Sequence, residues 1–349
     1  MENWNSKTIA AFRRDLLAWY DQEGRSTLPW RQDTDPYRVL VSELMLQQTR
    51  VDTVITYFNR FMAALPTVDD LAAAPEDQVL KLWEGLGYYS RAKNLQRAAK
   101  YVVNDLDGVW PQTYEGLQDL PGVGPYTAAA IASIAFNQVV PAVDGNFFRV
   151  FSRLLKINDD IAQPKTRKVF YEAIAPIVDP DRPGDFNQAI MDLGTTYMKA
   201  KNPDTLNSPV KAYNAAFRDG VEDQYPVKTK KKKPVRQVYQ AQVTYDDQGR
   251  LLYEQRPETG LLAGFWTLPL KQVDSIENLE GQQLTIKPVV HIFSHRRWEI
   301  WLVALDNDKT ADLAANQAWL SVADQEALAL PKVQHKLLAR LKEMDDVSQ

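Results

Sequence analysis

A glutamate within an apolar stretch is the residue of this sequence best suited to chemistry. Glu43 lies among apolar residues that run from Val39 to Leu46, and Gln47 shares its helix face four positions later. A carboxyl group desolvated by such neighbours has a raised pKa, in the range useful to a general acid. The alternative is a glutamate on a solvated helix face, which the apolar neighbours on both sides disfavour.

The segment Leu120–Thr127 predicts a tight hairpin between two helices. Its sequence is Leu-Pro-Gly-Val-Gly-Pro-Tyr-Thr, in which Gly122 and Gly124 flank Val123 and an Ala-rich helix follows. A hairpin of this kind directs backbone N–H groups and a helix N-terminus outward, which suits a phosphate. Because a Gly-x-Gly pair is short, a plain helix–turn–helix joint is the alternative.

An aspartate follows the hairpin in the segment Val143-Asp144-Gly145-Asn146. Taken alone, such a segment is an ordinary turn and helix N-cap. Its combination with the upstream hairpin and Ala-rich helix resembles the helix-hairpin-helix DNA glycosylases. In that superfamily the aspartate lies at the mouth of the base pocket, so the resemblance makes Asp144 a candidate catalytic carboxylate.

Further motifs narrow the resemblance to the adenine DNA glycosylases of the MutY family, and it extends over about residues 9–340. Each motif is similar to a functional segment of that family. The segments are Leu28–Arg31 and Val41–Arg50 around the acid, Gly85–Arg91 in the wedge loop, Phe186–Gly194 before the cluster loop, Gly260–Pro269 at the entry to the C-terminal domain and Phe293–His295 in the lesion loop.

The resemblance implies excision of adenine mispaired with 8-oxoguanine (or guanine) in double-stranded DNA. Glu43 would protonate N7 of the flipped adenine, and ionised Asp144 would stabilise the oxocarbenium-like sugar. Tyr126 and Asn146 would orient Asp144 and the attacking water. The other implied contacts are an adenine pocket of Trp30, Arg31 and Leu46, intercalation and lesion recognition by Gln48, Thr49, Leu86, Tyr88, Phe293, Ser294 and His295, and a phosphate-binding hairpin of Gly122, Val123 and Gly124.

The absence of cysteine departs from the usual members of this family. Those members hold an iron–sulfur cluster through four cysteines, whose positions correspond here to Met198, Thr205, Ser208 and Asn214. None of these side chains replaces a thiolate ligand, so we expect no cluster and no other metal. We expect aromatic and proline residues to hold this loop by packing.

Two other departures limit the expected chemistry. Tyr126 stands where bifunctional relatives carry a Schiff-base lysine, and a phenol forms no imine, so we expect no strand cleavage. Residues 264–290 lack the glutamate-rich metal box of a MutT-type hydrolase. The C-terminal domain is therefore expected to recognise rather than hydrolyse, which disfavours a nucleotide pyrophosphatase.

Hydrophobic periodicity divides the chain into two domains. Spacings of three and four residues predict short helices from about 6 to 220, and a period of two predicts strands after Val235. The intervening lysines repel one another and indicate a solvated linker. We expect a mainly α helix-hairpin-helix domain over 1–225, a basic linker over 226–236 and a small α+β, MutT-like (Nudix-like) domain over 237–349. The last domain is expected to contain a hairpin over 238–255 with its turn at 246–249, a hairpin over 289–305 with its turn at 294–297, and a helix over 324–344.

Composition favours a soluble cytoplasmic protein. Of the 349 residues, 45% are hydrophobic and 25% are charged, and no apolar run approaches the ~20 residues that span a bilayer. The polar segment Met1–Thr8 shows no signal peptide. The net charge of −4 still permits a local basic face for DNA. We expect a monomer with no membrane partner.

Two alternative functions share part of this pattern. A thymine or uracil mismatch glycosylase would have the hairpin and Asp144, but would lack the C-terminal domain and the surroundings of Glu43. A non-catalytic lesion-binding protein would result if the cluster-free loop had abolished activity, and the presence of both carboxylates argues against it.

Overall fold

The computed structural model describes residues 1–230, 233–305 and 313–347. The chain forms two compact units: residues 1–76 with 90–230, and residues 77–89 with 231–349. Residues 85–89 of the wedge segment therefore group with the C-terminal unit, and residues 90 and 91 group with the helical unit. The domain boundaries at 225 and 237 stay predictions. Lys231 and Lys232 of the expected linker lie outside the described residues.

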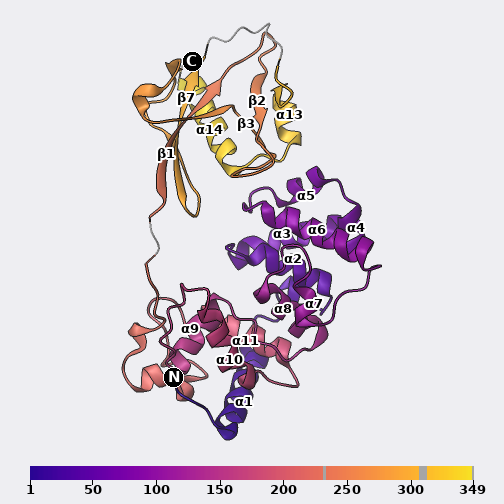
Figure 1. The fold of residues 1–349 in the computed structure, drawn as a ribbon, viewed down its shortest axis with the longest axis vertical. Coiled ribbons are helices and arrows are strands. Elements are labelled where there is room, and N and C mark those ends of the chain that lie inside the picture. The colour runs from indigo at the N-terminus through magenta and orange to yellow at the C-terminus, as the bar shows by residue number, and fades with distance from the viewer. Residues whose placement is uncertain (231–232, 306–312, 348–349) are drawn as a thin grey trace. The chain divides into compact units, whose positions relative to one another are not determined.

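The first unit is built from helices, as Figure 1 shows. Its α-helices are α1 (Ser6–Glu23), α2 (Pro36–Leu46), α3 (Val51–Ala64), α4 (Val68–Ala73), α6 (Ser90–Asp105), α7 (Tyr114–Leu117), α8 (Pro125–Phe136), α9 (Gly145–Leu154), α10 (Thr166–Ile174), α11 (Pro183–Thr196) and α12 (Ala215–Arg218). Short 3-10 turns join them at η1 (Pro29–Arg31), η2 (Ala175–Ile177), η3 (Lys211–Tyr213) and η4 (Glu222–Gln224). Helix α5 (Glu76–Trp83) begins at the last residue of this unit's first segment and continues in the second unit.

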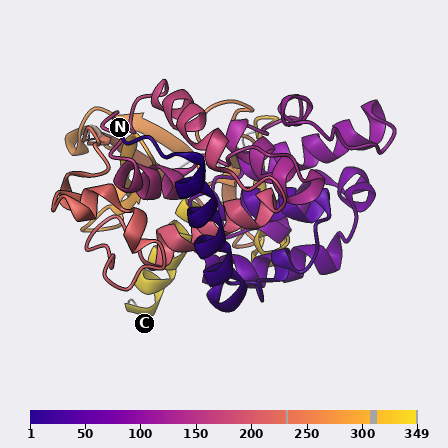
Figure 2. The same ribbon diagram turned by 90° about the horizontal axis from the view of Figure 1, so that it is seen from below.

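Helix α8 is central to this unit because its side chains are small. Residues 127–133 are all buried, and α2 and α11 both pack against this helix. Pro125 at the first helical position lacks an N–H that would otherwise need a partner, so the helix begins there at little cost. Helix α1 packs against α11 and is seen in indigo in Figure 2, with purple helices to one side. This packing places α2, α8, α9 and α11 around one cavity.

The second unit contains two β-sheets. Its strands are β1 (Val235–Val243), β2 (Leu251–Gln255), β3 (Trp266–Thr267), β4 (Leu270–Val273), β5 (Gln282–Gln283), β6 (Val289–Ile292), β7 (Arg296–Ala304) and β8 (Gln317–Leu320). One sheet has the order β4-β1-β7-β5, with β6 also paired to β7, and the other has the order β3-β2-β8. Strands β1 and β7 run parallel, and the remaining pairs are antiparallel.

The hairpin expected over 289–305 is confirmed, with a shorter turn. Val289 pairs with Ile300, and the N–H of Phe293 donates to the carbonyl of Arg296 at 2.8 Å. Residues 296 and 297, which we expected in the turn, begin β7. The loop Phe293–His295 therefore forms the tip of the hairpin β6–β7.

Two other expectations for this unit were wrong in part. The chain does turn at Asp246–Gly249, but β1 and β2 separate into different sheets and meet only near Tyr245 and Leu251. The alternation of apolar and polar residues predicted each strand. It could not show that β1 and β2 would pair with other strands instead of with each other. In place of the single helix expected over 324–344, the chain forms two helices, α13 (Val322–Ala327) and α14 (Lys332–Val347). Pro331 separates them, because a proline disfavours helical dihedral angles in the residue before it. In the part of the chain that the structure describes, no helix is long and apolar enough to cross a bilayer.

Candidate active site

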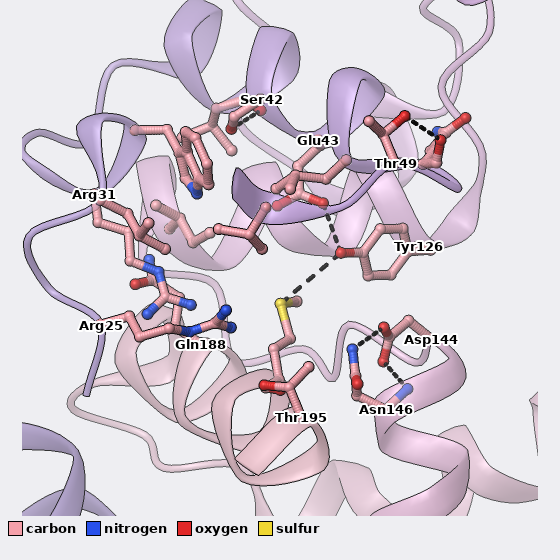
Figure 3. A pocket seen from close by; sticks show the side chains of 18 of the residues that line it. Arg25, Arg31, Ser42, Glu43, Thr49, Tyr126, Asp144, Asn146, Gln188 and Thr195 are labelled. Atoms are coloured by element: carbon pink, nitrogen blue, oxygen red, sulfur yellow. Dashed lines mark hydrogen bonds between the residues drawn. The ribbon is translucent and has the colours of Figure 1, made fainter. Parts of the chain in front are cut away.

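A cavity of about 360 Å³ lies within the helical unit (Figure 3). Both candidate carboxylates, Glu43 and Asp144, line it. The other predicted site residues in its wall are Trp30, Arg31, Leu46, Gln48, Thr49, Tyr126 and Asn146. The segments around Trp30, Glu43, Tyr126 and Asp144 therefore meet at one place.

Glu43 is buried on α2 and points into this cavity. Its neighbours Val39, Leu40 and Leu44 are also buried, so the apolar stretch surrounds the carboxyl group as the sequence predicted. The Tyr126 hydroxyl donates a hydrogen bond to Glu43 Oε2 at 2.6 Å. Burial raises the pKa of Glu43 to about 7, against the lowering effect of that bond. A carboxyl group with this pKa carries its proton in a large share of molecules at neutral pH, as a general acid requires.

Asp144 is held at the N-cap of α9. Its Oδ1 accepts from the backbone N–H groups of Asn146 and Phe147 at 2.8 and 2.9 Å, and its Oδ2 accepts from the Asn146 side-chain amide at 2.7 Å. Burial raises the pKa of Asp144, while these N–H donors oppose that rise by stabilising the ionised form. The N-cap interpretation of the Asp-Gly segment is therefore confirmed, and the helix cap fixes the carboxylate in the cavity wall, while its catalytic role stays a prediction.

Tyr126 and Asn146 have separate partners. The resemblance implied that both residues orient Asp144. In the structure, Asn146 donates to Asp144, but the Tyr126 hydroxyl donates to Glu43. The Arg149 guanidinium donates in turn to the Asn146 side-chain oxygen. Each carboxyl group thus has its own supporting residue.

A buried ion-pair network forms another part of the cavity wall. Arg31 donates to both carboxylate oxygens of Asp192 on α11, at 2.7 and 3.0 Å. Arg25 also pairs with Asp192, through its side chain and through its backbone N–H. Trp30, next to Arg31, packs its ring against Phe58. Two of the expected adenine-pocket residues, Trp30 and Arg31, are therefore held by packing and by ion pairing.

The end of α2 positions Gln48 and Thr49. Arg91 donates to the carbonyls of Leu44 and Gln47, at 2.7 and 2.5 Å, and so binds the carbonyl groups that the helix end leaves without intrahelical partners. Gln48 then adopts φ 58°, a conformation that non-glycine residues rarely take. Gln48 is exposed and lines the cavity.

The hairpin at Gly122–Gly124 needs glycine for two reasons. Gly122 has φ +77°, and a Cβ there would lie 2.5 Å from Cβ of Asn94 on α6. The N–H of Val123 donates to the carbonyl of Leu120 at 3.0 Å and closes the turn. Gly124 is exposed and caps the start of α8. This geometry is compatible with phosphate binding, which stays a prediction.

The remaining recognition residues belong to the second unit. Leu86 is buried, whereas Tyr88 is 48% exposed with φ 47°, and its hydroxyl lies 3.4 Å from Ser294 Oγ. Phe293 is anchored by its ring contact with Trp298, which leaves Ser294 and His295 exposed at the hairpin tip. The structure thus brings the wedge tyrosine and the lesion loop together.

The four positions aligned with cluster cysteines are all buried. The Asn214 amide donates to Glu222 at 2.7 Å, and the Thr205 hydroxyl also donates to Glu222. One thioether, two hydroxyls and one amide do not form a ligand set for an iron–sulfur cluster, and no residue of the full sequence supplies a thiolate. The expected aromatic packing is also present, since Tyr213 contacts Phe12.

Sequence reasoning missed several cavity residues. They are Arg25, Ser42, Gln188, Met191, Thr195 and, behind Arg31, Asp192. Gln188 and Asp192 lie four positions apart on α11, a spacing that places them on one helix face. That spacing was visible in the sequence, but nothing in it showed which arginine an aspartate on this face would meet.

The combination of a helix-hairpin-helix fold with a buried acid and a fixed carboxylate defines a DNA glycosylase of base excision repair. Residues 41–176 match the HhH-GPD superfamily base excision DNA repair protein family, and residues 240–340 match the NUDIX domain family. The chain is 36% identical to an adenine DNA glycosylase of Mus musculus over 384 residues, which cover 90% of this chain and 74% of that protein. The chain belongs to the adenine DNA glycosylase family.

Solved structures agree with the fold of the helical part of the chain. A thermostable thymine-DNA glycosylase has a TM-score of 0.54 and 26% identity, covering 61% of this chain and 98% of the other. Endonuclease III in a non-covalent DNA complex has a TM-score of 0.52 and 20% identity, covering 62% and 98%. The second similarity concerns the fold alone. The predicted fold, a helical glycosylase domain followed by a Nudix-like domain, is confirmed.

Proposed function

We propose that this enzyme removes adenine mispaired with 8-oxoguanine from duplex DNA, with Glu43 as the general acid. The observation that carries the proposal is the buried Glu43 carboxyl, with a pKa of about 7, in a cavity that Asp144 also lines. The family's name supports adenine as the base that is removed. Endonuclease III, which shares the fold of the helical unit, binds DNA in its solved complex, and this supports DNA as the partner.

The two carboxyl groups have different tasks in this mechanism. Tyr126 donates to Glu43 Oε2, so Oε1 is the oxygen that carries the acid proton and gives it to N7 of the flipped adenine. The C1′–N9 bond then breaks with its electron pair on the base. The ionised Asp144 stabilises the positive sugar until water adds at C1′ and releases a proton. The products are free adenine and an abasic site.

Recognition of 8-oxoguanine is assigned to the hairpin tip. Ser294 and His295 are exposed there and offer hydrogen-bonding groups, while Phe293 fixes the loop against Trp298. Tyr88, whose hydroxyl is 3.4 Å from Ser294 Oγ, is positioned to enter the base stack beside them. The oxidised base differs from guanine at O8 and N7–H, so a few hydrogen bonds suffice to discriminate.

A single-turnover excision assay with excess enzyme tests the proposal. Duplexes carrying adenine opposite 8-oxoguanine, adenine opposite guanine, thymine opposite guanine and uracil opposite guanine are compared at one pH. Adenine opposite 8-oxoguanine should be processed fastest. Faster removal of thymine or uracil would instead support the mismatch glycosylase, which the 26% identity to a thymine-DNA glycosylase makes the second candidate.

We also propose that the enzyme leaves the DNA strand intact. Tyr126 occupies the position of the lyase lysine, and a phenol forms no Schiff base. The abasic product should therefore break only after alkali or heat. A covalent adduct trapped in good yield by borohydride would contradict this.

Activity without an iron–sulfur cluster is part of the same proposal. The side chains at the four cysteine positions are buried and do not fit a cluster. Anaerobically purified enzyme should be colourless and active with iron far below one equivalent. Stoichiometric iron that is lost together with activity would contradict it.

A further inference from the structure

The charge of Arg31 opposes the chemistry proposed for Glu43. Arg31 lines the same cavity with its side chain only 7% exposed, so solvent screens it poorly. A positive charge nearby favours the ionised form of a carboxyl group, and Arg31 does lower the pKa of Glu43. It would also repel the positive charge that protonation places on adenine. An unbalanced Arg31 would therefore weaken the general acid.

Asp192 is placed to balance this charge. Its side chain is 2% exposed, and its two oxygens accept from both Nη atoms of Arg31, an arrangement that fixes the guanidinium plane. Arg25 donates to the same carboxylate from its Nε at 2.7 Å and its backbone N–H at 3.0 Å. In Figure 3, Arg25 and Arg31 lie on the same side of the cavity. The buried Asp192 carboxylate therefore pairs with two guanidinium groups.

The protonation states of this network follow from the contacts. Burial opposes the charge of Asp192, but the hydrogen bonds and charges of Arg31 and Arg25 outweigh it, so the pKa of Asp192 is lowered. Burial likewise opposes the charge of Arg31, and Asp192 reverses that effect, so the pKa of Arg31 is raised. Asp192 and Arg31 are therefore both ionised across the pH range in which Glu43 titrates.

The other groups around Glu43 do not balance Arg31. Tyr126 on α8 is a neutral donor, and its pKa is raised well above its ordinary value by burial. Asp144, the remaining carboxylate in the wall, is held by Asn146 at the start of α9 and is reserved for the sugar in the proposed reaction. Tyr20 on α1 presents its ring to Arg31 at 5.8 Å and carries no charge at neutral pH.

We propose that Asp192 is a positioning residue for the glycosylase reaction, which orients Arg31 in the cavity wall and offsets part of its charge so that Glu43 keeps its proton at neutral pH. The proposal rests on the proposed function of Glu43 as the general acid. Asp192 itself acts only through Arg31. Its loss therefore changes the pH at which the acid is competent, and not only the rate.

The test is the pH profile of single-turnover adenine excision, with enzyme in excess, from pH 5.5 to 9. Since Glu43 must be protonated, the wild-type rate should fall as pH rises through about 7. Asp192→Asn removes the charge and should move this fall to lower pH by about one unit. Above pH 8 the rate of this variant should therefore be about tenfold lower than that of the wild type. Arg31→Gln should move it in the opposite direction. Asp192→Glu should restore a profile close to that of the wild type.

Asp185→Asn is the matched control. It makes the same substitution on the same helix, but Asp185 is 42% exposed and pairs with Arg182 at 2.8 Å, outside the wall of this cavity. Its profile should stay at the wild-type position. The control separates a loss of charge at the cavity from a general change in the charge of α11.

The outcomes distinguish the two proposals. A wild-type profile that is flat, or that persists in Glu43→Gln, overturns the assignment of the acid, and this inference with it. A profile that depends on Glu43 but keeps its position in both Asp192→Asn and Arg31→Gln overturns the role of Asp192 alone. So does an Asp192→Asn rate that is reduced by one constant factor at every pH. If Asp192→Asn does not fold, the double variant Asp192→Asn, Arg31→Gln takes its place, because it leaves no unpaired charge of Arg31. Its profile should match that of Arg31→Gln, and a further displacement would overturn the role of Asp192.

Discussion

The cavity of the helical unit and the hairpin tip of the second unit are built on opposite principles. Glu43 and Asp144 line one cavity, and hydrogen bonds from Tyr126 and from Asn146 hold them in place. Ser294 and His295, by contrast, are exposed at the tip of the hairpin β6–β7. Chemistry at C1′ needs a dry and rigid site, because burial raises the pKa of the acid and holds the charges in place. Reading the opposite base needs groups that reach into DNA. Variants of the two regions should therefore fail differently.

The largest effect is expected from Glu43→Gln. The amide keeps the size of the side chain but donates no acid proton, so excision should slow by about 10²- to 10⁴-fold. Binding to the lesion duplex, measured by fluorescence anisotropy, should persist, because phosphate and lesion contacts lie elsewhere. Glu172→Gln, which makes the same change at an exposed position of α10, should retain the wild-type rate. Near-normal turnover in Glu43→Gln would contradict the assignment of the chemistry to the cavity and of lesion recognition to the hairpin tip.

The double variant Ser294→Ala, His295→Ala should change selectivity and spare the chemistry. Each lost hydrogen bond to the oxidised base contributes about 0.5–1.5 kcal/mol, so the preference for 8-oxoguanine over guanine should shrink by about 5- to 150-fold. Excision of adenine opposite guanine should change little. An unchanged ratio between the excision rates opposite 8-oxoguanine and opposite guanine would indicate that Thr49, Leu86 and Tyr88 recognise the lesion instead.

These point substitutions are sharper than deletion of the C-terminal domain. Tyr89 packs its ring 4.4 Å from that of Phe265 and donates to the carbonyl of Leu330 at 3.1 Å. A deletion would expose this buried tyrosine and disturb the neighbouring wedge residue. The deletion would therefore change both selectivity and folding, and the two effects could not be separated.

Tyr126→Phe should have a smaller effect within the cavity. The hydroxyl stabilises the ionised form of Glu43, so its loss should raise the pKa of the acid further and move the fall in rate to higher pH. The maximal rate should decrease by about 2- to 12-fold, the contribution of one hydrogen bond. A fall that moves to lower pH in the single-turnover profile would contradict the role of Tyr126.

Asn214→Ala should have the smallest effect on excision and a clear effect on stability. It removes the donor to Glu222 and the helix cap that accepts from the N–H of Phe217. The free energy of unfolding in urea should fall by about 1–3 kcal/mol, while the excision rate of the folded enzyme stays within about twofold. Asn207→Ala is the control, because Asn207 is exposed in the same loop and donates to an exposed partner, Asp204. Equal losses in both variants would show that the buried network is not what holds the loop.

Local sequence was sufficient for much of the catalytic site. The apolar run around Glu43 predicted its burial, because residues three and four apart share a helix face whatever the fold. Gly122 and the Asp144 cap were predictable for the same reason, since a turn and a helix start depend on a few consecutive residues. The alternation around Phe293 likewise predicted its hairpin, which pairs strands adjacent in the chain.

Partners that are distant in the chain could not be predicted in this way. Tyr126 was expected to serve Asp144 but donates to Glu43, and Asp192 meets Arg31 across 161 positions. Strands β1 and β2 turn back on each other and then join different sheets. The residue types and local spacing determined that this protein has a buried glutamate, a capped carboxylate and a glycine-containing hairpin between two helices. Only the packing of α2, α8, α9 and α11 decided which side chain supports which, because hydrogen-bond partners depend on distances between helices that no local pattern encodes.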